Sequence, residues 1–401
     1  MVWEPAIHRP NPEDILSRMI PLAYTLRNIF RRPLQSIQLI GGSSFVVLLI
    51  MTAFAMNQSM KQTLSNSGSE QNIIFLGAGS EESVERSEVP FGLEEILSAN
   101  LTDIHQVMKQ AAISPEIHYN GLVKFGKEHQ VQALIRGVQH QAFWVHHQVR
   151  LLEGRYPQSG EVIIGRLAHH KLGLSPKALS LGKSIDFNGE SFKIVGVFDA
   201  RGTVMEAEIW MPLFDLMTHT QRETLSCVVF SSKSADAYDQ AEVFAQTRLD
   251  LELVALKESA YYQKLSSFYA PIRWMAWVSA ILISVGAFMG GLNTLYATFS
   301  SRIREFGTLQ AIGFSRKSIF ISILEEAMST GVLAAITAIT FAFLFIQDIS
   351  FPFAIGVFTF DFNNTVILTG MFSGILLSLA GVLPPSWKCL RPSLTQTLRS
   401  S

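Results

Sequence analysis

The sequence predicts an α+β membrane protein in which four transmembrane helices carry a large mixed α/β extracytoplasmic domain, inserted between helices 1 and 2. Hydrophobic residues make up 48% of the 401 residues and charged residues only 16%, whereas soluble proteins carry roughly 25% charged residues. Short β-rich and helical patterns fill the long segment between the first two apolar stretches. Four stretches contain no Asp, Glu, Lys or Arg and are each long enough, as a helix, to cross a bilayer: residues 37–56, 274–299, 327–346 and 365–383.

The N-terminal segment, residues 1–35, is predicted to be cytoplasmic and amphipathic. Apolar side chains recur at helical spacing through residues 15–30, beside several arginines, which is typical of a helix at the lipid surface. A solvated basic leader is the alternative. Pro33 marks a turn into transmembrane helix 1, residues 36–57. We expect a retained anchor, because the apolar stretch is too long for the core of a signal peptide.

The extracytoplasmic domain, residues 58–270, is long enough for its own core and for two subdomains. Apolar residues return at helical intervals over residues 90–110, and a second helix is expected over 235–248. Strands are predicted by short β-rich runs bounded by Gly, Pro, Asn or Ser, at residues 72–76, 121–125, 131–137, 161–165, 184–187, 191–198, 208–211 and 225–230.

No local signature of an enzyme stands in this domain. Adjacent histidines such as His146 and His147 would point to opposite faces of a strand, and no Cys, Asp or Glu stands beside them at a compact ligand spacing, so we expect no metal site. The run Leu181-Gly182-Lys183-Ser184 has lysine at position 177, where a phosphate loop needs its first glycine. We therefore expect no catalytic residue and no cofactor in this chain.

The distribution of basic residues orients the C-terminal half. Arginine and lysine gather in residues 1–35, 300–322 and 386–401, whereas residues 347–364 contain Asp348 and Asp361 and no basic residue. The positive-inside rule therefore places both termini and the central loop in the cytoplasm. Cys227 and Cys389 then lie on opposite sides of the membrane and cannot form a disulfide. The expected order is transmembrane helix 2 at 271–299, a cytoplasmic loop or helix at 300–322, helix 3 at 323–346, a periplasmic loop at 347–364, helix 4 at 365–385 and a cytoplasmic tail at 386–401.

The central segment carries a family resemblance. Residues 301–327 read SRIREFGTLQAIGFSRKSIFISILEEA. This closely resembles the signature of FtsX/MacB-type ABC-transporter permeases, in which Arg-x-Arg-Glu-aliphatic-Gly precedes Ala-x-Gly, a basic pair and a Glu-Ala that enters the third span. Residues 26–36 resemble the family's approach to its first span, and residues 151–213 its MacB-like periplasmic core. The chain departs from the pattern at Ser301 and Phe306, which stand where an acidic and an aliphatic residue are usual.

The resemblance implies that the central segment forms a coupling helix, which contacts a separate cytoplasmic ATPase. Gly307 and Gly313 can break or redirect the chain, and Ser315 can cap the helix that follows. Glu326 stands at the membrane edge, where an unpaired carboxylate is costly, so we expect it to pair with an arginine, Arg302 or Arg304. The candidate coupling residues are Arg302, Arg304, Glu305, Gly307, Ala311, Gly313, Phe314, Ser315, Arg316 and Lys317.

Gly286, Gly290 and Gly291 form a small-residue face on transmembrane helix 2 that can pack within the chain or against a second copy. The resemblance implies a homodimer in the bacterial inner membrane, with ATP and Mg bound by the partner ATPase and no nucleic acid. It also implies a non-catalytic permease that exports a periplasmic or outer-leaflet substrate by mechanotransmission, together with a periplasmic adaptor and an outer-membrane channel. Two alternatives stay open: a lipoprotein-release permease, and an FtsX-like signalling scaffold that controls a cell-wall hydrolase.

Overall fold

A computed structural model of the chain describes residues 31, 33–126, 129–234 and 236–390. The amphipathic helix predicted for residues 15–30 and the last part of the predicted tail, residues 391–401, lie outside the described residues. The chain divides into two compact units. The helical unit contains residues 1–55, 273–348 and 360–401, and the β-rich unit contains residues 56–272 and 349–359.

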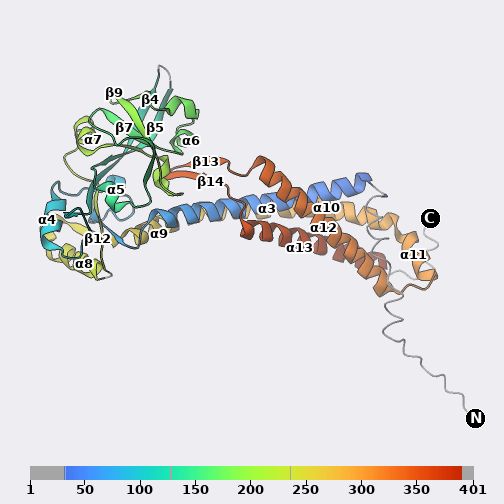
Figure 1. The fold of residues 1–401 in the computed structure, drawn as a ribbon. Coiled ribbons are helices and arrows are strands. Elements are labelled where there is room, and N and C mark those ends of the chain that lie inside the picture. The colour runs from blue at the N-terminus through green and yellow to red at the C-terminus, as the bar shows by residue number, and fades with distance from the viewer. Residues whose placement is uncertain (1–30, 32, 127–128, 235, 391–401) are drawn as a thin grey trace, which may run out of the picture. The chain divides into compact units, whose positions relative to one another are not determined.

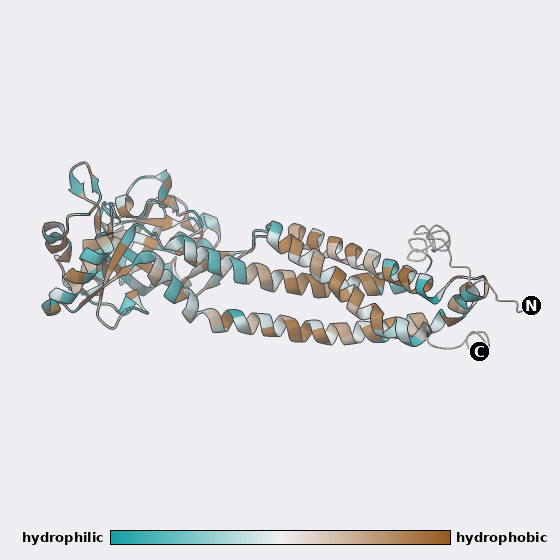
Figure 2. Ribbon diagram, turned by 90° about the horizontal axis from the view of Figure 1, so that it is seen from below, coloured by the Kyte–Doolittle hydropathy of each residue, from teal (hydrophilic) through white to brown (hydrophobic). Residues whose placement is uncertain are grey.

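Four long helices of the described residues are long and apolar enough to cross a membrane, as predicted. They are α3 (Pro33–Ser67), α10 (Ala270–Ser301), α12 (Arg316–Phe345) and α13 (Asn364–Leu390), and they are predominantly hydrophobic in Figure 2. Helix α3 continues beyond the apolar stretch because Met60 and Leu64, four positions apart, are both fully buried in the β-rich unit. A short helix, α11 (Ile303–Ala311), lies between α10 and α12 in the sequence.

Helices α12 and α13 lie side by side in the helical unit (Figure 1). Their contact is made by small residues, since a Cβ added at Gly331 would lie 2.8 Å from the carbonyl oxygen of Gly374 and 2.5 Å from Oγ of Ser378. Small side chains let two helix backbones approach closely, which gives dispersion contact where lipid removes the hydrophobic driving force. Alanines continue the buried face of α12, namely Ala327, Ala334, Ala335, Ala338 and Ala342.

A ten-stranded mixed sheet forms the β-rich unit, in the order β12-β1-β11-β4-β5-β10-β7-β9-β6, with β8 pairing with β4 and β9. The predicted strands are all present, some of them longer than expected. Most pairs are antiparallel, but β10 runs parallel to β5 and β7 parallel to β9. The strands are β1 (Asn72–Gly77), β4 (Ile113–Phe125), β5 (His129–Val138), β6 (Arg150–Gly154), β7 (Glu161–Gly165), β8 (Ser184–Phe187), β9 (Glu190–Asp199), β10 (Ile209–Pro212), β11 (Cys227–Ser231) and β12 (Leu253–Lys257).

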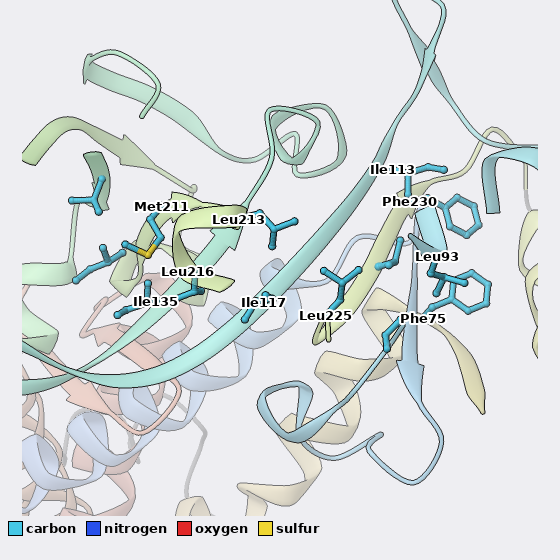
Figure 3. Packing of buried hydrophobic residues seen from close by; sticks show 14 of the residues in the cluster. Phe75, Leu93, Ile113, Ile117, Ile135, Met211, Leu213, Leu216, Leu225 and Phe230 are labelled. Carbon is cyan, nitrogen blue, oxygen red and sulfur yellow. The ribbon is translucent and has the colours of Figure 1, made fainter. Parts of the chain in front are cut away.

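Strand β4 joins two halves of this unit. Its first residues pair with β11, and its residues from Ile117 onward pair with β5. Figure 3 shows Phe75 and Phe230 packed near one end of β4, Met211 and Leu216 near β5, and Ile117 between the two groups. One continuous hydrophobic core therefore runs under both halves. The helices around the sheet are α4 (Leu93–Asn100), α5 (Ala142–Val145), α6 (Ala168–Lys171), α7 (Leu213–Thr220), α8 (Ala237–Thr247) and α9 (Glu258–Phe268).

The helix predicted over residues 90–110 is wrong beyond Asn100. Leu101 is extended, and a small hairpin of β2 (Gln106–Val107) and β3 (Gln110–Ala111) follows, with Met108 and Lys109 at positive φ in its turn. Leu101 and Ile104 are buried, but they lie in an extended segment and not in a helix. Their three-residue spacing therefore matched helical periodicity by coincidence. Asn188 and Gly189, both at positive φ, form the hairpin turn between β8 and β9.

The predicted loop at residues 347–364 contains a second small hairpin, β13 (Ser350–Phe353) and β14 (Gly356–Thr359), which belongs to the β-rich unit. Nζ of Lys171, at the end of α6, donates to the carbonyl oxygens of Phe353 and Ala354. Oγ of Ser59, in the last part of α3, donates to the carbonyl oxygen of Thr359 at 2.7 Å. The hairpin is thus bonded to two elements of the β-rich unit.

Candidate functional site

The segment between α10 and α12 turns twice. The first break falls at Arg302, whose φ of −102° and ψ of 2° leave the helical region between α10 and α11. The second falls at Gly313, whose φ of +108° strongly favours glycine. Oγ of Ser315 then accepts from the backbone N–H of Ser318 at 3.1 Å and caps α12, as predicted. Gly307 was expected to break the helix, but it is buried within α11 and the chain turns at Arg302 instead.

Arg302 is the centre of an ion-pair cluster. Its residue is only 5% exposed, and its Nη1 lies 3.0 Å from both carboxylate oxygens of Glu326 on α12. Its Nε donates to Glu305 on α11 at 3.2 Å, and its guanidinium lies 5.3 Å from the ring centre of Phe306. Of the two arginines expected beside Glu326, Arg302 makes this contact. One side chain therefore connects the end of α10 with both following helices.

The remaining candidates fall into two groups. Phe314 is half-buried and packs against the apolar cluster that contains Phe306 and Ile319, so it anchors the turn. The turn itself, residues 311–317, is exposed apart from Phe314, and we call it the coupling turn. Ile312 in this turn is 71% exposed, and sequence reasoning missed it because a single apolar residue in a turn leaves no periodic signal. The exposed candidates are Arg304, Ala311, Gly313, Ser315, Arg316 and Lys317.

A cavity of about 220 Å³ lies beside the ion pair in the helical unit. Helices α3, α10, α12 and α13 line it, and the side chain of Glu326 keeps 22% exposure there. Its polar lining includes hydroxyl groups, those of Thr294, Thr298, Thr330 and Ser378 among them. These groups can bind and orient a polar molecule.

The glycine face of α10 has no close partner within the described part of the chain. A Cβ added at Gly286, Gly290 or Gly291 would meet nothing within 4 Å. The sequence left open whether these three glycines pack within the chain or against a second copy. Among the described residues they make no tight contact within the chain, whereas Gly331 and Gly374 do.

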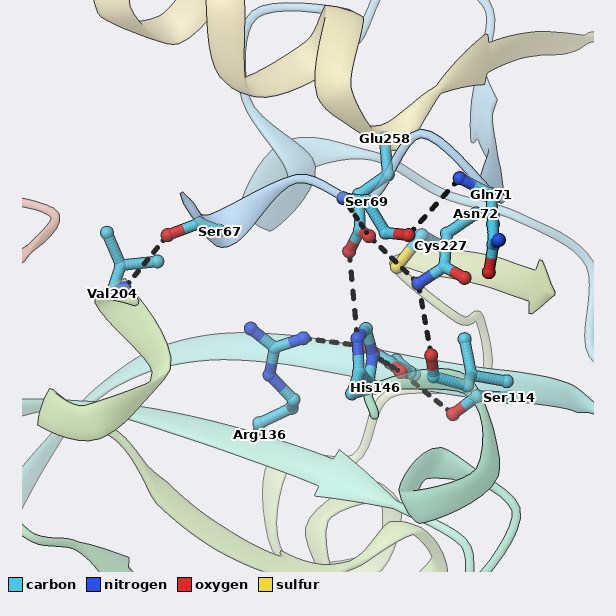
Figure 4. Close-up of polar contacts among 12 residues, drawn as sticks. Ser67, Ser69, Gln71, Asn72, Ser114, Arg136, His146, Val204, Cys227 and Glu258 are labelled. Carbon is cyan, nitrogen blue, oxygen red and sulfur yellow. Dashed lines mark hydrogen bonds and ion pairs between the residues drawn. The ribbon is translucent and has the colours of Figure 1, made fainter. Parts of the chain in front are cut away.

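A second group of charged residues, which sequence reasoning missed, is buried in the β-rich unit (Figure 4). We call Glu116, Arg136, His146, Glu208 and Glu258 the buried charge network. Arg136 binds Glu208 with two hydrogen bonds of 2.7 Å and Glu116 with one of 2.8 Å. Nε2 of His146 lies 2.7 Å from Oε1 of Glu116.

The electrostatics of the network are mutually consistent. Burial raises the pKa of Glu116, but the charges of His146 and Arg136 lower it more, so that it lies well below 4.5. Burial likewise raises the pKa of Glu208, and Arg136 lowers it below its ordinary value. The pKa of His118 is lowered by its burial and by Arg136, which keeps that imidazole neutral. A partial signal was available in the sequence, since Arg136 interrupts the apolar run of β5 and Glu208 directly precedes the apolar strand β10.

Glu116, His118 and Cys227 place three ligand-type atoms within 4.8 Å of one another. Oε2 of Glu116 accepts from Nη1 of Arg136, so a guanidinium already supplies the positive charge that a metal ion would bring. Burial and the neighbouring Glu116 raise the pKa of the Cys227 thiol well above 9.0, whereas a metal ligand must be a thiolate. These residues are therefore better suited to the ion network than to a metal.

Comparisons with known proteins match nearly the whole described chain. The family described as MacB-like periplasmic core domain matches residues 39–244, and the family described as FtsX-like permease C-terminal matches residues 277–394. No curated protein matches the chain.

Three solved structures with similarity to the chain are single domains or regions of larger proteins. The periplasmic region of MacB from Actinobacillus actinomycetemcomitans is 12% identical, with 50% of this chain and 94% of that chain covered and a TM-score of 0.38. The extracellular domain of the ABC-type transporter YknZ from Gram-positive bacteria is 15% identical, with 46% and 99% covered and a TM-score of 0.36. A domain of a permease protein from Porphyromonas gingivalis is 14% identical, with 46% and 88% covered and a TM-score of 0.33.

Proposed function

Because this chain belongs to the FtsX/MacB-type family of ABC-transporter permeases, we propose that it couples ATP hydrolysis by a separate ATPase to movement of its β-rich unit. The chain is a multi-pass permease subunit of the inner membrane, and its family implies an ABC ATPase as partner. In this proposal both termini and the coupling turn face the cytoplasm, the β-rich unit faces the periplasm, and the ATPase binds ATP and Mg.

The contact of Arg302 with Glu305 and Glu326 is the observation that carries the proposal. Arg302 stands where α10 ends, and it binds α11 and α12 with one guanidinium. A force applied to the coupling turn by an ATPase would therefore move the ends of α10 and α12 together, because a buried ion pair resists separation. The exposed surface of the turn provides basic side chains and Ile312 for such a contact.

The chain also supplies several routes from the helices to the β-rich unit. It passes between the two units after residues 55, 272, 348 and 359. The route through residues 349–359 ends in the hairpin that Lys171 and Ser59 bind. Movement of the helices would thus be transmitted through both ends of the hairpin as well as through α3 and α10.

We assign the transport cycle to a homodimer that exports a periplasmic or outer-leaflet substrate, with a periplasmic adaptor and an outer-membrane channel as further partners. The glycine face of α10 supports the dimer, since Gly286, Gly290 and Gly291 have open space above them. In nanodiscs, Gly290→Leu should lower the dimer fraction if a second copy packs there. If Gly290→Leu leaves the dimer fraction unchanged, the two copies must contact each other through another surface.

Cross-linking tests the central claim. Lys317→Cys, in a Cys389→Ser background, places a reactive thiol on the coupling turn, while Cys227 is buried and stays unreactive. After purification of the permease with its ATPase, we expect a cross-link between residue 317 and the ATPase. Asn364→Cys, at the exposed start of α13, is the control and should give none. A cross-link at residue 364 and none at 317 would refute both the orientation and the coupling site.

A further inference from the structure

One contact of the buried charge network is left incomplete. Nδ1 of His146 lies 3.6 Å from Oε1 of Glu258, and it makes no hydrogen bond among the described residues. Both side chains are nearly inaccessible, with exposures of 0% and 3%. Figure 4 shows the imidazole between Arg136 on one side and Glu258 on the other. Two buried polar groups that face each other without a bond need an explanation.

The position of one proton explains this geometry. Oε1 of Glu116 also accepts from Oγ of Ser114 at 2.8 Å, so the ionised carboxylate of Glu116 requires Nε2 of His146 to be the donor of their bond. Nδ1 then carries either a lone pair or a second proton. A lone pair on Nδ1 that faces an ionised Glu258 would be repulsive in a buried site. One proton, bound either to Nδ1 of His146 or to Oε1 of Glu258, makes the contact attractive.

Glu258 also holds two chain segments together. Its Oε2 accepts from the backbone N–H of Ser69 at 3.0 Å and from Nδ2 of Asn72 at 2.9 Å. Ser69 follows the end of α3, and Glu258 is the first residue of α9, which precedes α10 in the chain. The two segments are in close contact, since a Cβ added at Gly68 would lie 2.6 Å from Cα of Ser259. We call residues 67–72 and 258–262 the helix joint.

We propose that a single proton shared by His146 and Glu258 closes the helix joint, so that the joint loosens as the pH outside the membrane rises. This inference rests on the proposed function for its physiological meaning, since α3 and α10 are the helices that would transmit movement. Loss of the proton leaves a buried carboxylate facing an imidazole lone pair. The repulsion between them, and the cost of burying the charge, then favour a side-chain conformation of Glu258 that breaks its bond to Ser69 and exposes the carboxylate to water.

The surrounding charges support this arrangement. Burial lowers the pKa of His146, but the charge and hydrogen bond of Glu116, together with Glu258, raise it above 6.5 overall. Burial, together with the charge of Glu116, raises the pKa of Glu258 above its ordinary value, although His146, Ser69 and Asn72 act to lower it. The titratable and charged groups that face the pair are Glu116 and His118 from β4, Arg136 from β5, Glu208 ahead of β10, Cys227 from β11 and Tyr262 from α9.

The sign of the pH dependence follows from these directions. His146 binds a proton more tightly in the folded protein than in water, so the stabilisation from its proton is complete below the ordinary pKa of an imidazole. It is lost as the pH rises through the folded-state pKa of His146. The raised pKa of Glu258 acts in the same sense, with its contribution complete below 4.5. Glu116 and Glu208 act in the opposite sense, since their pKa values are lowered and their contribution is lost only in acid. A joint that loosens in mild alkali is therefore specific to the His146 and Glu258 pair.

Hydrogen exchange on the full-length permease in nanodiscs tests the proposal. We expect the protection of residues 67–72, corrected for intrinsic exchange rates, to fall by up to about tenfold for each pH unit between the ordinary pKa of an imidazole and the folded-state pKa of His146, and to level off above that pKa. Glu258→Gln keeps an oxygen acceptor for Ser69 and gains an amide donor toward His146, so its protection should no longer depend on pH. Asp250→Asn, which changes an exposed carboxylate, should behave like the wild type.

Wild-type protection that does not change with pH would refute the proposal, and this measurement needs no variant to fold. An unchanged pH dependence in Glu258→Gln would refute it as well. Exchange at the helix joint is independent of the ATPase, so the result is separable from the proposed function. If the joint loosens with pH but residue 317 gives no cross-link, the shared proton of His146 and Glu258 is supported and the proposed coupling to the ATPase is refuted.

Discussion

Arg302 and Glu326 stand 24 positions apart in the chain, and Nη1 of Arg302 lies 3.0 Å from both carboxylate oxygens of Glu326. The contact closes a loop of chain that contains α11 and the coupling turn. Whatever moves this turn must either carry α12 with it or break the pair. In the proposed function, this ion pair would therefore help to carry force from the coupling turn to the membrane helices.

We predict that Glu326→Gln separates ATP hydrolysis from movement of the β-rich unit. Removing one partner of a buried ion pair costs about 3–5 kcal/mol, and partial solvent access at Glu326 should bring the cost to the lower end of this range. The ATPase should still bind and hydrolyse ATP, while distances between spin labels on the two units should stop responding to nucleotide. Glu325→Gln is the control, and unchanged distances in Glu326→Gln would remove Glu326 from the coupling site.

The coupling turn should bind the ATPase partly through Ile312. Burying an isoleucine side chain contributes about 1.5–3 kcal/mol, so Ile312→Asp should weaken ATPase binding by about tenfold or more. Ile312→Leu keeps the apolar area and should bind nearly as well as the wild type. The Kd of the purified ATPase for the permease in nanodiscs measures the effect. Equal affinity of the Asp and Leu variants would show that the ATPase binds elsewhere.

The sequence was sufficient to predict features that local chemistry determines. The four spans follow from uncharged stretches, and the cap of α12 follows from a serine placed before a helical run. The arginine partner of Glu326 was predicted as one of two, because an intramembrane carboxylate requires a cation nearby. The roles of the coupling residues stay predictions.

Features that depend on distant contacts could not be predicted from the sequence. The buried charge network takes its side chains from β4, β5, α9 and the segments beside α5 and β10, so no local pattern contains it. Leu101 and Ile104 kept a helical spacing although the chain there is extended, because burial from a strand-like segment can produce the same spacing. The helix break falls at Arg302 rather than Gly307, and Arg302 has a partner, Glu326, that lies 24 positions away in the sequence.

The contact of α12 with α13 should be sensitive to a single methyl group. Gly331→Ala would bring its Cβ to 2.5 Å from Oγ of Ser378, and overpacking of this kind costs about 1–3 kcal/mol. We expect a lower thermal unfolding temperature for the permease in nanodiscs. Gly41→Ala on α3 is the matched control, because its Cβ meets nothing within 4 Å and it lies outside the proposed dimer face. Equal unfolding temperatures for the two variants would show that α12 and α13 are less tightly packed than this contact requires.

Arg136 should be the residue of the buried charge network on which the β-rich unit depends most. Arg136→Met leaves Glu116 and Glu208 buried without their common cation, which costs about 3–5 kcal/mol. Arg155→Met breaks an ion pair whose arginine is solvent-exposed, and such pairs contribute little to stability. Hydrogen exchange of β4 and β5 in the full-length protein compares the two variants.

The pH dependence of this difference provides a sharper test. Glu116 and Glu208 have lowered pKa values, so their stabilisation by Arg136 is complete above 4.5 and is lost as the pH falls through the folded-state values. In Arg136→Met both carboxyl groups can take up protons and become neutral, which removes the buried negative charge. The stability difference between wild type and Arg136→Met should therefore shrink in acid. A difference that stays constant with pH would mean that packing of the arginine side chain, not its charge, stabilises the domain.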